Sequence, residues 1–229
     1  YRADLASRLA AYRAQPVRPM TLAPDCFPED GEAAGPALDA FFTLPDGPGR
    51  LPELGAGPPC DAVVSPHIDY DRGAALYAQA YLRVAEGAAD ADLFVLLGTD
   101  HRGELDEPIT LTRLDFETPF GQLRTDVALV EHLEATCGGS VVANELAHAG
   151  EHSLEFQAVM LHHVLGPRAA KARILPVLCG PMGGRSDVPD PRRPGQIAAF
   201  LEQLAEAVQG RHVCFIAGAD LAHLGPTFQ

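Results

Sequence analysis

Three short apolar runs in this 229-residue chain each end in a polar loop that carries a histidine. The pairs are Ala62–Val64 with His67, Asp92–Leu97 with His101, and Val213–Ile216 with His223. Short runs of this kind, rich in branched apolar residues, are typical of buried strands. Helical patterns lie between them, among them Gly73–Val84 and Gln196–Val208. This alternation predicts an α/β domain with a mostly parallel central sheet flanked by helices.

The placement of the three histidines predicts a shared crevice. In open α/β sheets, polar residues just past the carboxyl ends of the strands line the ligand site. If the three strands are neighbours, the imidazoles of His67, His101 and His223 point into one space. Imidazole with nearby carboxylate suits Fe(II), Zn(II) or another first-row metal. The nearby acids are Asp69, Asp100 and Asp220, and Glu151 with His152 opens a helix that could close the same site.

Three of these residues, Glu151, His152 and Asp220, also have a simpler structural interpretation. Glu151 suits the N-terminus of a helix, where the macrodipole favours an acid. His152 could be a packed histidine at the helix start, and Asp220 could hold the following turn through side-chain to backbone hydrogen bonds. Spacing alone therefore leaves a metal site and a purely structural role about equally open.

Composition narrows the class of partner. The chain has 31 acidic and 17 basic residues, a formal charge of −14, which argues against nucleic acid and anionic membrane as partners. No apolar run is long enough to cross a bilayer. The five cysteines are scattered without a C-x-x-C motif, which favours core packing in a reducing cytoplasm.

The first 58 residues differ in character from the rest. They contain a helical pattern at Asp4–Arg13 and a helical turn at Pro36–Phe42, separated by a Pro- and acid-rich stretch. We therefore expect residues 1–58 to form an irregular, partly helical N-terminal extension and residues 59–229 to form the compact α/β domain. Within that domain, Ser140–Ala143 is expected to be a short strand.

Several motifs resemble those of a known family. S-P-H-I-D-Y, L-G-T-D-H, T-P-F-G-Q-L-R-T-D, E-H-S-L-E-F-Q, I-L-P-V-L and A-D-L-A-H-L-G follow one another along the chain. In this order they resemble the Memo family, which includes the AmmeMemoRadiSam system protein B. That family is similar in fold to the class III extradiol dioxygenases, which use non-haem iron to open catechol rings.

The resemblance implies roles for individual residues. His67 and His101 match two metal-ligand histidines, and His223 matches an acid/base histidine that also lines the metal pocket. Asp220 matches the acid beside it, and His152 matches a further pocket histidine. The expected metal ligands are thus His67, His101 and His223, and the expected catalytic residues are His223, Asp220 and His152.

The chain departs from the family pattern in three places. It has Thr99-Asp100-His101-Arg102 where the family usually has Pro-Ser-His-His, and Gly218-Ala219 where the family has Ser-Ser. The family's third ligand lies in a later Cys-Gly motif, which would fall beyond Gln229. The resemblance therefore predicts that the domain is truncated at its C-terminal end.

The sequence supports more than one function. The first hypothesis is a Memo-like non-haem iron oxidoreductase of the dioxygenase type, with Fe(II) as the expected metal and zinc or copper as alternatives. The second is a non-catalytic metal-binding or adaptor protein that holds a peptide or small ligand in a vestigial active site. A zinc hydrolase with an activated water is a third, weaker hypothesis, because the chain has no H-E-x-x-H motif.

Overall fold

A five-stranded sheet forms the centre of the protein in the computed structural model, which describes residues 2–101, 105–181 and 190–219. The strand order is β1 (Ala62–Ser65), β7 (Val213–Gly218), β2 (Leu93–Thr99), β6 (Arg173–Cys179) and β3 (Ile109–Leu111). The first four strands are parallel, and β3 runs antiparallel to β6. The predicted α/β fold with a mostly parallel central sheet is confirmed.

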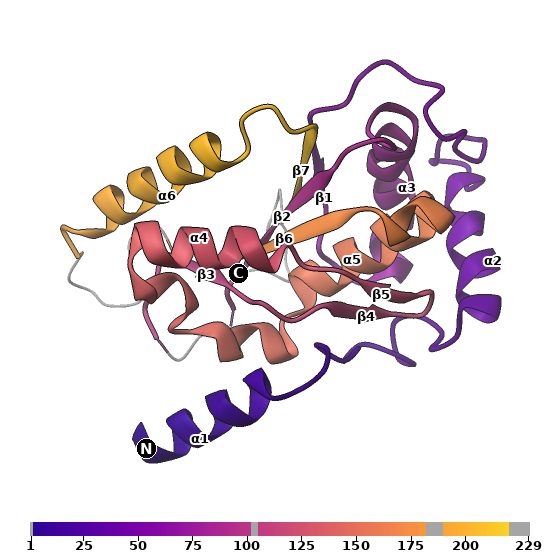
Figure 1. The fold of residues 1–229 in the computed structure, drawn as a ribbon. Coiled ribbons are helices and arrows are strands. Elements are labelled where there is room, and N and C mark those ends of the chain that lie inside the picture. Colours follow the sequence, from indigo (N-terminus) through magenta and orange to yellow (C-terminus); the bar gives the residue numbers. More distant parts are fainter. Residues whose placement is uncertain (1, 102–104, 182–189, 220–229) are drawn as a thin grey trace, which may run out of the picture.

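Helices cover both faces of the sheet (Figure 1). In β2, Phe94 and Leu96 belong to one hydrophobic core, whereas Leu93 and Val95 belong to the other. This two-sided burial explains why the strand reads as a continuous apolar run. The first core includes residues of α2 (Gly31–Phe42), α3 (Tyr70–Gly87) and α5 (His152–Leu165), and the second includes residues of α4 (Val127–Cys137) and α6 (Arg193–Ala207).

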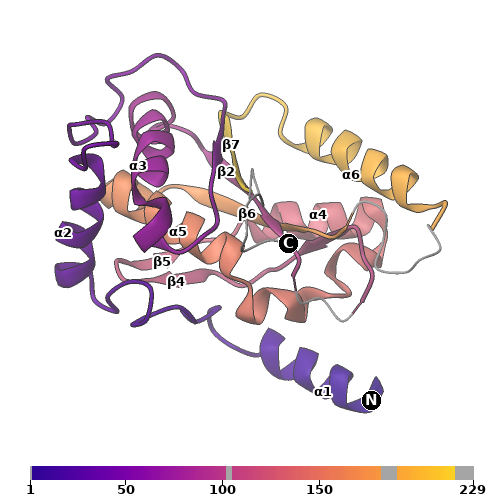
Figure 2. The ribbon, with the colours of Figure 1, turned by 180° about the vertical axis from the view of Figure 1, so that it is seen from behind.

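The segment before the first strand is only partly peripheral. Helix α1 (Arg2–Arg13) lies at the edge of the molecule in both views (Figures 1 and 2) and contacts the 3₁₀ helix η2 (Glu145–Gly150). Farther along, Phe27, Leu38 and Phe42 are buried in the first core. Helix α2 begins at Gly31, earlier than the predicted Pro36, because Asp30 caps it by accepting a hydrogen bond from the Ala33 amide.

Residues 140–143 do not form the expected strand. The segment is part of a 3₁₀ helix, η1 (Gly139–Val142), which follows Gly138 at a φ of 81°. Val141 and Val142 bury their side chains in the second core from this helix. The prediction was wrong because a pair of β-branched residues can reach the core from a short helical turn as well as from a strand. The remaining elements are the hairpin strands β4 (Phe116–Thr118) and β5 (Gly121–Leu123) and the 3₁₀ helix η3 (Gly166–Ala170).

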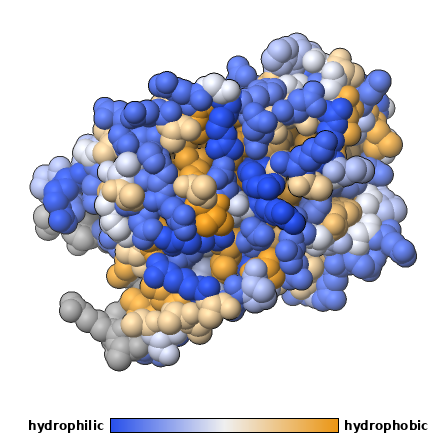
Figure 3. All heavy atoms as spheres, viewed as in Figure 1, coloured by the Kyte–Doolittle hydropathy of each residue, from blue (hydrophilic) through white to orange (hydrophobic). Residues whose placement is uncertain are grey.

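The surface of the face seen in Figure 3 is mostly hydrophilic, with separate apolar patches. Val64 and Leu201 are among the large hydrophobic residues that remain exposed. Across the described ranges, no helix has both the length and the apolar character that a membrane crossing requires.

The start of α5 packs closely on the end of β2. The Ser153 hydroxyl accepts a hydrogen bond from the Thr99 amide and donates one to the Thr99 carbonyl oxygen. A Cβ atom on Gly98 would lie 2.6 Å from Ser153 Oγ and 2.8 Å from two Leu154 side-chain carbons. The absence of a side chain at Gly98 therefore allows the helix to begin directly against the strand.

This close approach gives a stability prediction. Gly98→Ala should lower the free energy of unfolding by about 1–3 kcal/mol, because the added methyl group must push the start of α5 away from the sheet. Urea denaturation would measure the loss. Gly195→Ala is the matched control, since a Cβ there would meet no described atom within 4 Å apart from its chain neighbours and its own helix backbone. As a helical position, it should be neutral or slightly stabilising. Equal stability of Gly98→Ala and the parent protein would contradict the prediction.

Candidate metal centre

The strand order brings the histidine loops to one edge of the sheet. His67 and His101 each follow the last residue of a strand, β1 and β2, by two positions. Strand β7 lies between these two strands and pairs with both. As a result, the ring centroids of His67 and His101 are 5.2 Å apart although the residues are far apart in sequence.

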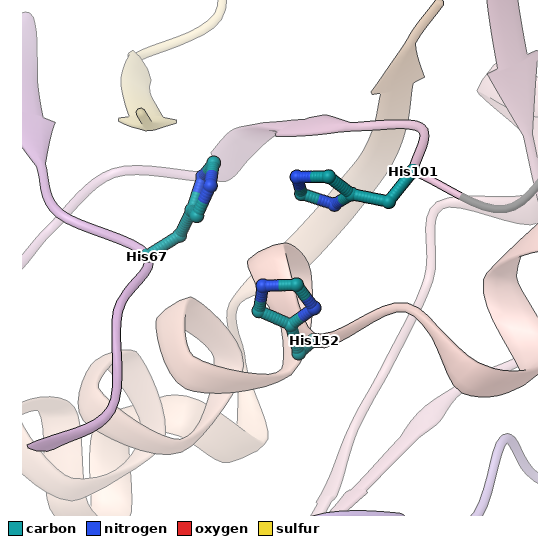
Figure 4. Close-up of side chains that lie close together, drawn as sticks. All are labelled: His67, His101 and His152. Carbon is teal, nitrogen blue, oxygen red and sulfur yellow. The ribbon is translucent and has the colours of Figure 1, made fainter. Parts of the chain in front are cut away.

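A third histidine comes from the start of a helix and not from a strand-end loop. His152 is the first residue of α5, and its ring centroid lies 5.5 Å from that of His67 and 4.8 Å from that of His101. The rings of His101 and His152 are stacked, whereas that of His67 is perpendicular to both. Figure 4 shows the three rings turned toward a common space. One ligand atom from each lies within 4.8 Å of the others.

The orientation of His67 is fixed by backbone groups. Its ring is buried, and Nδ1 lies 2.9 Å from the carbonyl oxygen of Gly218. A carbonyl oxygen can only accept, so Nδ1 carries the proton and Nε2 presents a lone pair, as a metal ligand must. The preceding residue is held too, because Gln157 Nε2 donates to the Pro66 carbonyl oxygen and Tyr81 donates to Gln157 Oε1.

Glu151 contacts the other two histidines. Its buried carboxylate accepts hydrogen bonds from His101 Nδ1, at 3.0 Å, and from the His101 amide, at 3.1 Å. His152 Nδ1 lies 3.3 Å from the same oxygen that faces His101 Nδ1. Burial alone would raise the pKa of Glu151, but hydrogen bonds from Ser153 and His101 outweigh it and lower the pKa below its usual value. The carboxylate is therefore ionised beside the cluster.

The two aspartates near these strand ends have other partners. Asp69 caps α3 and forms an ion pair with Arg72, whose hydrogen bond holds the pKa of the Asp69 carboxyl below its usual value. Asp100 is buried and accepts a hydrogen bond from Asn144 Nδ2 at 3.1 Å. Neither is a member of the three-histidine group. His223 and Asp220 lie outside the described residues, so their predicted roles stay predictions.

Three histidines away from the cluster have structural partners. His148 is buried, which lowers its pKa to about 3, and its Nε2 donates to the Thr110 carbonyl oxygen. His162 pairs with the Thr118 hydroxyl, and burial lowers its pKa to about 4. His163 pairs with Asp39. The first two are therefore neutral at physiological pH.

Arg18 is an important residue that the sequence pattern did not reveal. It lies in the Pro-rich N-terminal stretch, yet its side chain is fully buried and forms an ion pair with Glu155 of α5. Its guanidinium also donates to the carbonyl oxygens of His148 and Glu151, on either side of the turn that leads into α5. Arg18 belongs to no periodic pattern of apolar residues and has no acid close to it in the sequence, so the sequence does not indicate this contact.

The donor set fits a first-row divalent metal. Two imidazole nitrogens bound to one ion at about 2.1 Å lie no more than about 4.2 Å apart. The three ligand atoms lie within 4.8 Å of one another, so small side-chain rotations bring them to one ion. Iron, zinc and copper all accept imidazole ligands. The sequence predicted His152 as a catalytic pocket residue, whereas the structure groups it with His67 and His101, two of the three predicted ligands.

Comparison with known proteins points to one family. A family model described as Memo-like protein matches residues 18–229. A MEMO1 family protein of Methanopyrus kandleri is 32% identical over 202 residues, which covers 87% of this chain and 66% of that protein. A MEMO1 family protein of Ignicoccus hospitalis is 28% identical over 92% of this chain and 70% of its own length. One from Thermus thermophilus is 28% identical, and 56% of its length is covered.

Proposed function

Because the chain belongs to the Memo-like family, we propose that it is a metal-dependent oxidoreductase whose site is built on His67, His101 and His152. The observation that carries the proposal is the convergence of three imidazoles, from two strand-end loops and one helix start, within 4.8 Å of one another. Such a set occupies one side of an ion and leaves positions for a substrate or O₂.

Access to the cluster supports a reactive role over a buried structural one. His67 lies at the floor of the group and is only 3% exposed. The side chains of His101 and His152 are 36% and 33% exposed, so the group opens toward solvent on their side. A structural metal site is usually closed, with four protein ligands, whereas a catalytic site keeps a position open.

Fe(II) is the metal that we propose, with zinc and copper as the alternatives. Imidazole nitrogen suits all three ions, so the choice of iron rests on the resemblance of the family to non-haem iron dioxygenases. When bound, an Fe(II) ion supplies the redox chemistry with O₂. The proposed substrate is a small molecule with two adjacent oxygen donors, of which a catechol is the simplest.

The protein's own residues would bind the metal ion, orient the ligand rings and move the substrate proton. Gly218 O and Glu151 hold His67 and His101 as Nε2 donors, so each ring is oriented before a ligand arrives. From the resemblance, we propose that His223 takes the proton of a substrate hydroxyl and that Asp220 tunes its basicity. Strand β7, which precedes both residues in the sequence, lies between the strands of His67 and His101, and this supports the proposal.

Anaerobic loading with Fe(II) followed by oxygen uptake tests the proposal. We expect the dialysed protein to retain one iron per chain and to consume O₂ when a catechol is added. Protein loaded with Zn(II) is the matched control, because it uses the same residues but cannot carry the redox step. Iron retention without oxygen uptake on any catechol would support the non-catalytic metal-binding or adaptor role instead, and failure to retain any metal would contradict both.

A further inference from the structure

Glu151 stands apart from the other acids that cap helices in this protein. Its Oε1 accepts from the Ser153 amide, which makes it the N-cap of α5. The same oxygen faces the Nδ1 atoms of both His101 and His152, and Oε2 accepts from the His101 backbone amide. Among the other caps, Asp30 accepts from the Ala33 amide, and Asp126 accepts from the Leu129 amide and pairs with Arg211. Neither of these contacts involves a histidine. Capping alone therefore does not account for the contacts of Glu151.

The protonation of the imidazoles follows from these contacts. Both oxygens of the Glu151 carboxylate accept from backbone amides, Oε1 from Ser153 and Oε2 from His101. A ring nitrogen that hydrogen-bonds to the accepting oxygen Oε1 therefore donates. His101 then carries its proton on Nδ1 and presents the lone pair of Nε2 to the common space. The position of His152 Nδ1 beside the same oxygen favours the same state for that ring. One carboxylate thus selects the metal-binding form of two histidines.

The contacts also join two separate parts of the fold. His101 belongs to the loop after β2, whereas His152 belongs to α5, and Glu151 lies between them with a side chain that is only 1% exposed. The Arg18 guanidinium holds the Glu151 carbonyl oxygen at 2.9 Å, which fixes the backbone from the other side. The carboxylate has little room to reorient, so the distance between the two rings is set before any ligand binds.

We propose that Glu151 is the positioning residue of this centre, one carboxylate that orients both His101 and His152 as Nε2 donors. The inference rests on the proposed metal-binding function for its purpose, and the orientation of the rings is tested separately on protein without metal. Carboxylates that hold ligand histidines typically change metal affinity 10–100-fold when they are removed.

The test compares Glu151→Gln with Asp30→Asn. Glutamine keeps the size of the side chain and one acceptor oxygen. Its NH₂ group replaces the other oxygen and cannot accept a hydrogen bond, so either the Oε1 contacts with Ser153 and His101 Nδ1 or the Oε2 contact with the His101 amide is lost. Asp30→Asn makes the same chemical change at the cap of α2, where the Asp30 side chain accepts from the Ala33 amide and pairs with no histidine among the described residues. Two readouts are needed: Zn(II) affinity by competition with a chelator, and the tautomers of the histidine rings from ¹⁵N NMR of the metal-free proteins.

We expect Glu151→Gln to weaken Zn(II) binding by about 10–100-fold and to change His101 from a single Nδ1-protonated form to a mixture of tautomers. Asp30→Asn should change neither readout. The proposal is overturned if Glu151→Gln retains both the parent affinity and the parent tautomer, or if His101 in the parent carries its proton on Nε2. If the parent protein binds no metal, the proposed function fails, and the tautomer measurement alone still decides whether Glu151 orients the rings.

Discussion

Substitution of His67 by alanine is expected to abolish stoichiometric metal binding. The residue supplies one of the three nitrogen donors that the described part of the chain brings together. Loss of an orienting partner alone costs 10–100-fold in affinity, so loss of a ligand should cost more than about 100-fold. Competition titration with Zn(II) would measure the change, and metal analysis after dialysis would count the ions retained per chain.

The matched control for this substitution is His132→Ala. His132 lies on α4, is exposed, and is not a member of the three-histidine group. Both variants remove an imidazole, but only His67→Ala should lose the metal. His67 also contacts the Gly218 carbonyl oxygen, so circular dichroism is needed to show that the variant is folded. Equal retention of metal by the two folded variants would contradict the assignment of the site.

The meeting of His67 with His101 could be predicted from the sequence because it follows from a general property of parallel sheets. Chain segments that leave parallel neighbouring strands at their carboxyl ends emerge at the same edge. A histidine directly after a strand is therefore predicted to lie at this edge of the sheet, beside the histidine of another such strand, provided that the two strands are close in the sheet. The observed order β1-β7-β2 meets that condition.

The place of His152 and Glu151 could be predicted only in part. Their position at the start of a helix could be predicted, since Glu151 is an acid followed by a run with helical character. That the helix start faces the strand ends depends on its packing against Gly98 and on the hydrogen bonds of Ser153 to Thr99. These are contacts between segments about 50 residues apart, and no periodicity within either segment encodes them.

Arg18 shows a clearer limit of sequence reasoning. Its acceptors at His148, Glu151 and Glu155 lie 130 to 137 residues away, and its own neighbourhood is irregular and proline-rich in sequence. The only trace of the pair is Glu155, a charged residue on a helix whose other faces are also buried. A buried acid of this kind requires a cation somewhere in the fold, but the sequence does not say which one.

Arg18→Met is expected to produce a large loss of stability. Both side chains of the Arg18–Glu155 pair are completely buried, 2.7 Å apart. Glu155 would keep its hydrogen bonds from Thr21 and Leu22, but its charge would have no counter-ion. Breaking one side of a buried pair typically costs about 3–5 kcal/mol. Urea denaturation of the metal-free protein would measure this loss.

Two further variants separate the buried charge from a general effect of losing an arginine. Arg168→Met breaks a partly exposed ion pair with Asp90 and should cost less than about 1 kcal/mol. The double variant Arg18→Met with Glu155→Gln removes both charges, so it should be more stable than the sum of the single losses implies. If Arg18→Met does not fold, Arg18→Lys keeps the charge but loses the forked geometry, and an intermediate loss is expected. A loss for Arg18→Met no larger than that for Arg168→Met would show that the buried pair does not hold the N-terminal segment to α5.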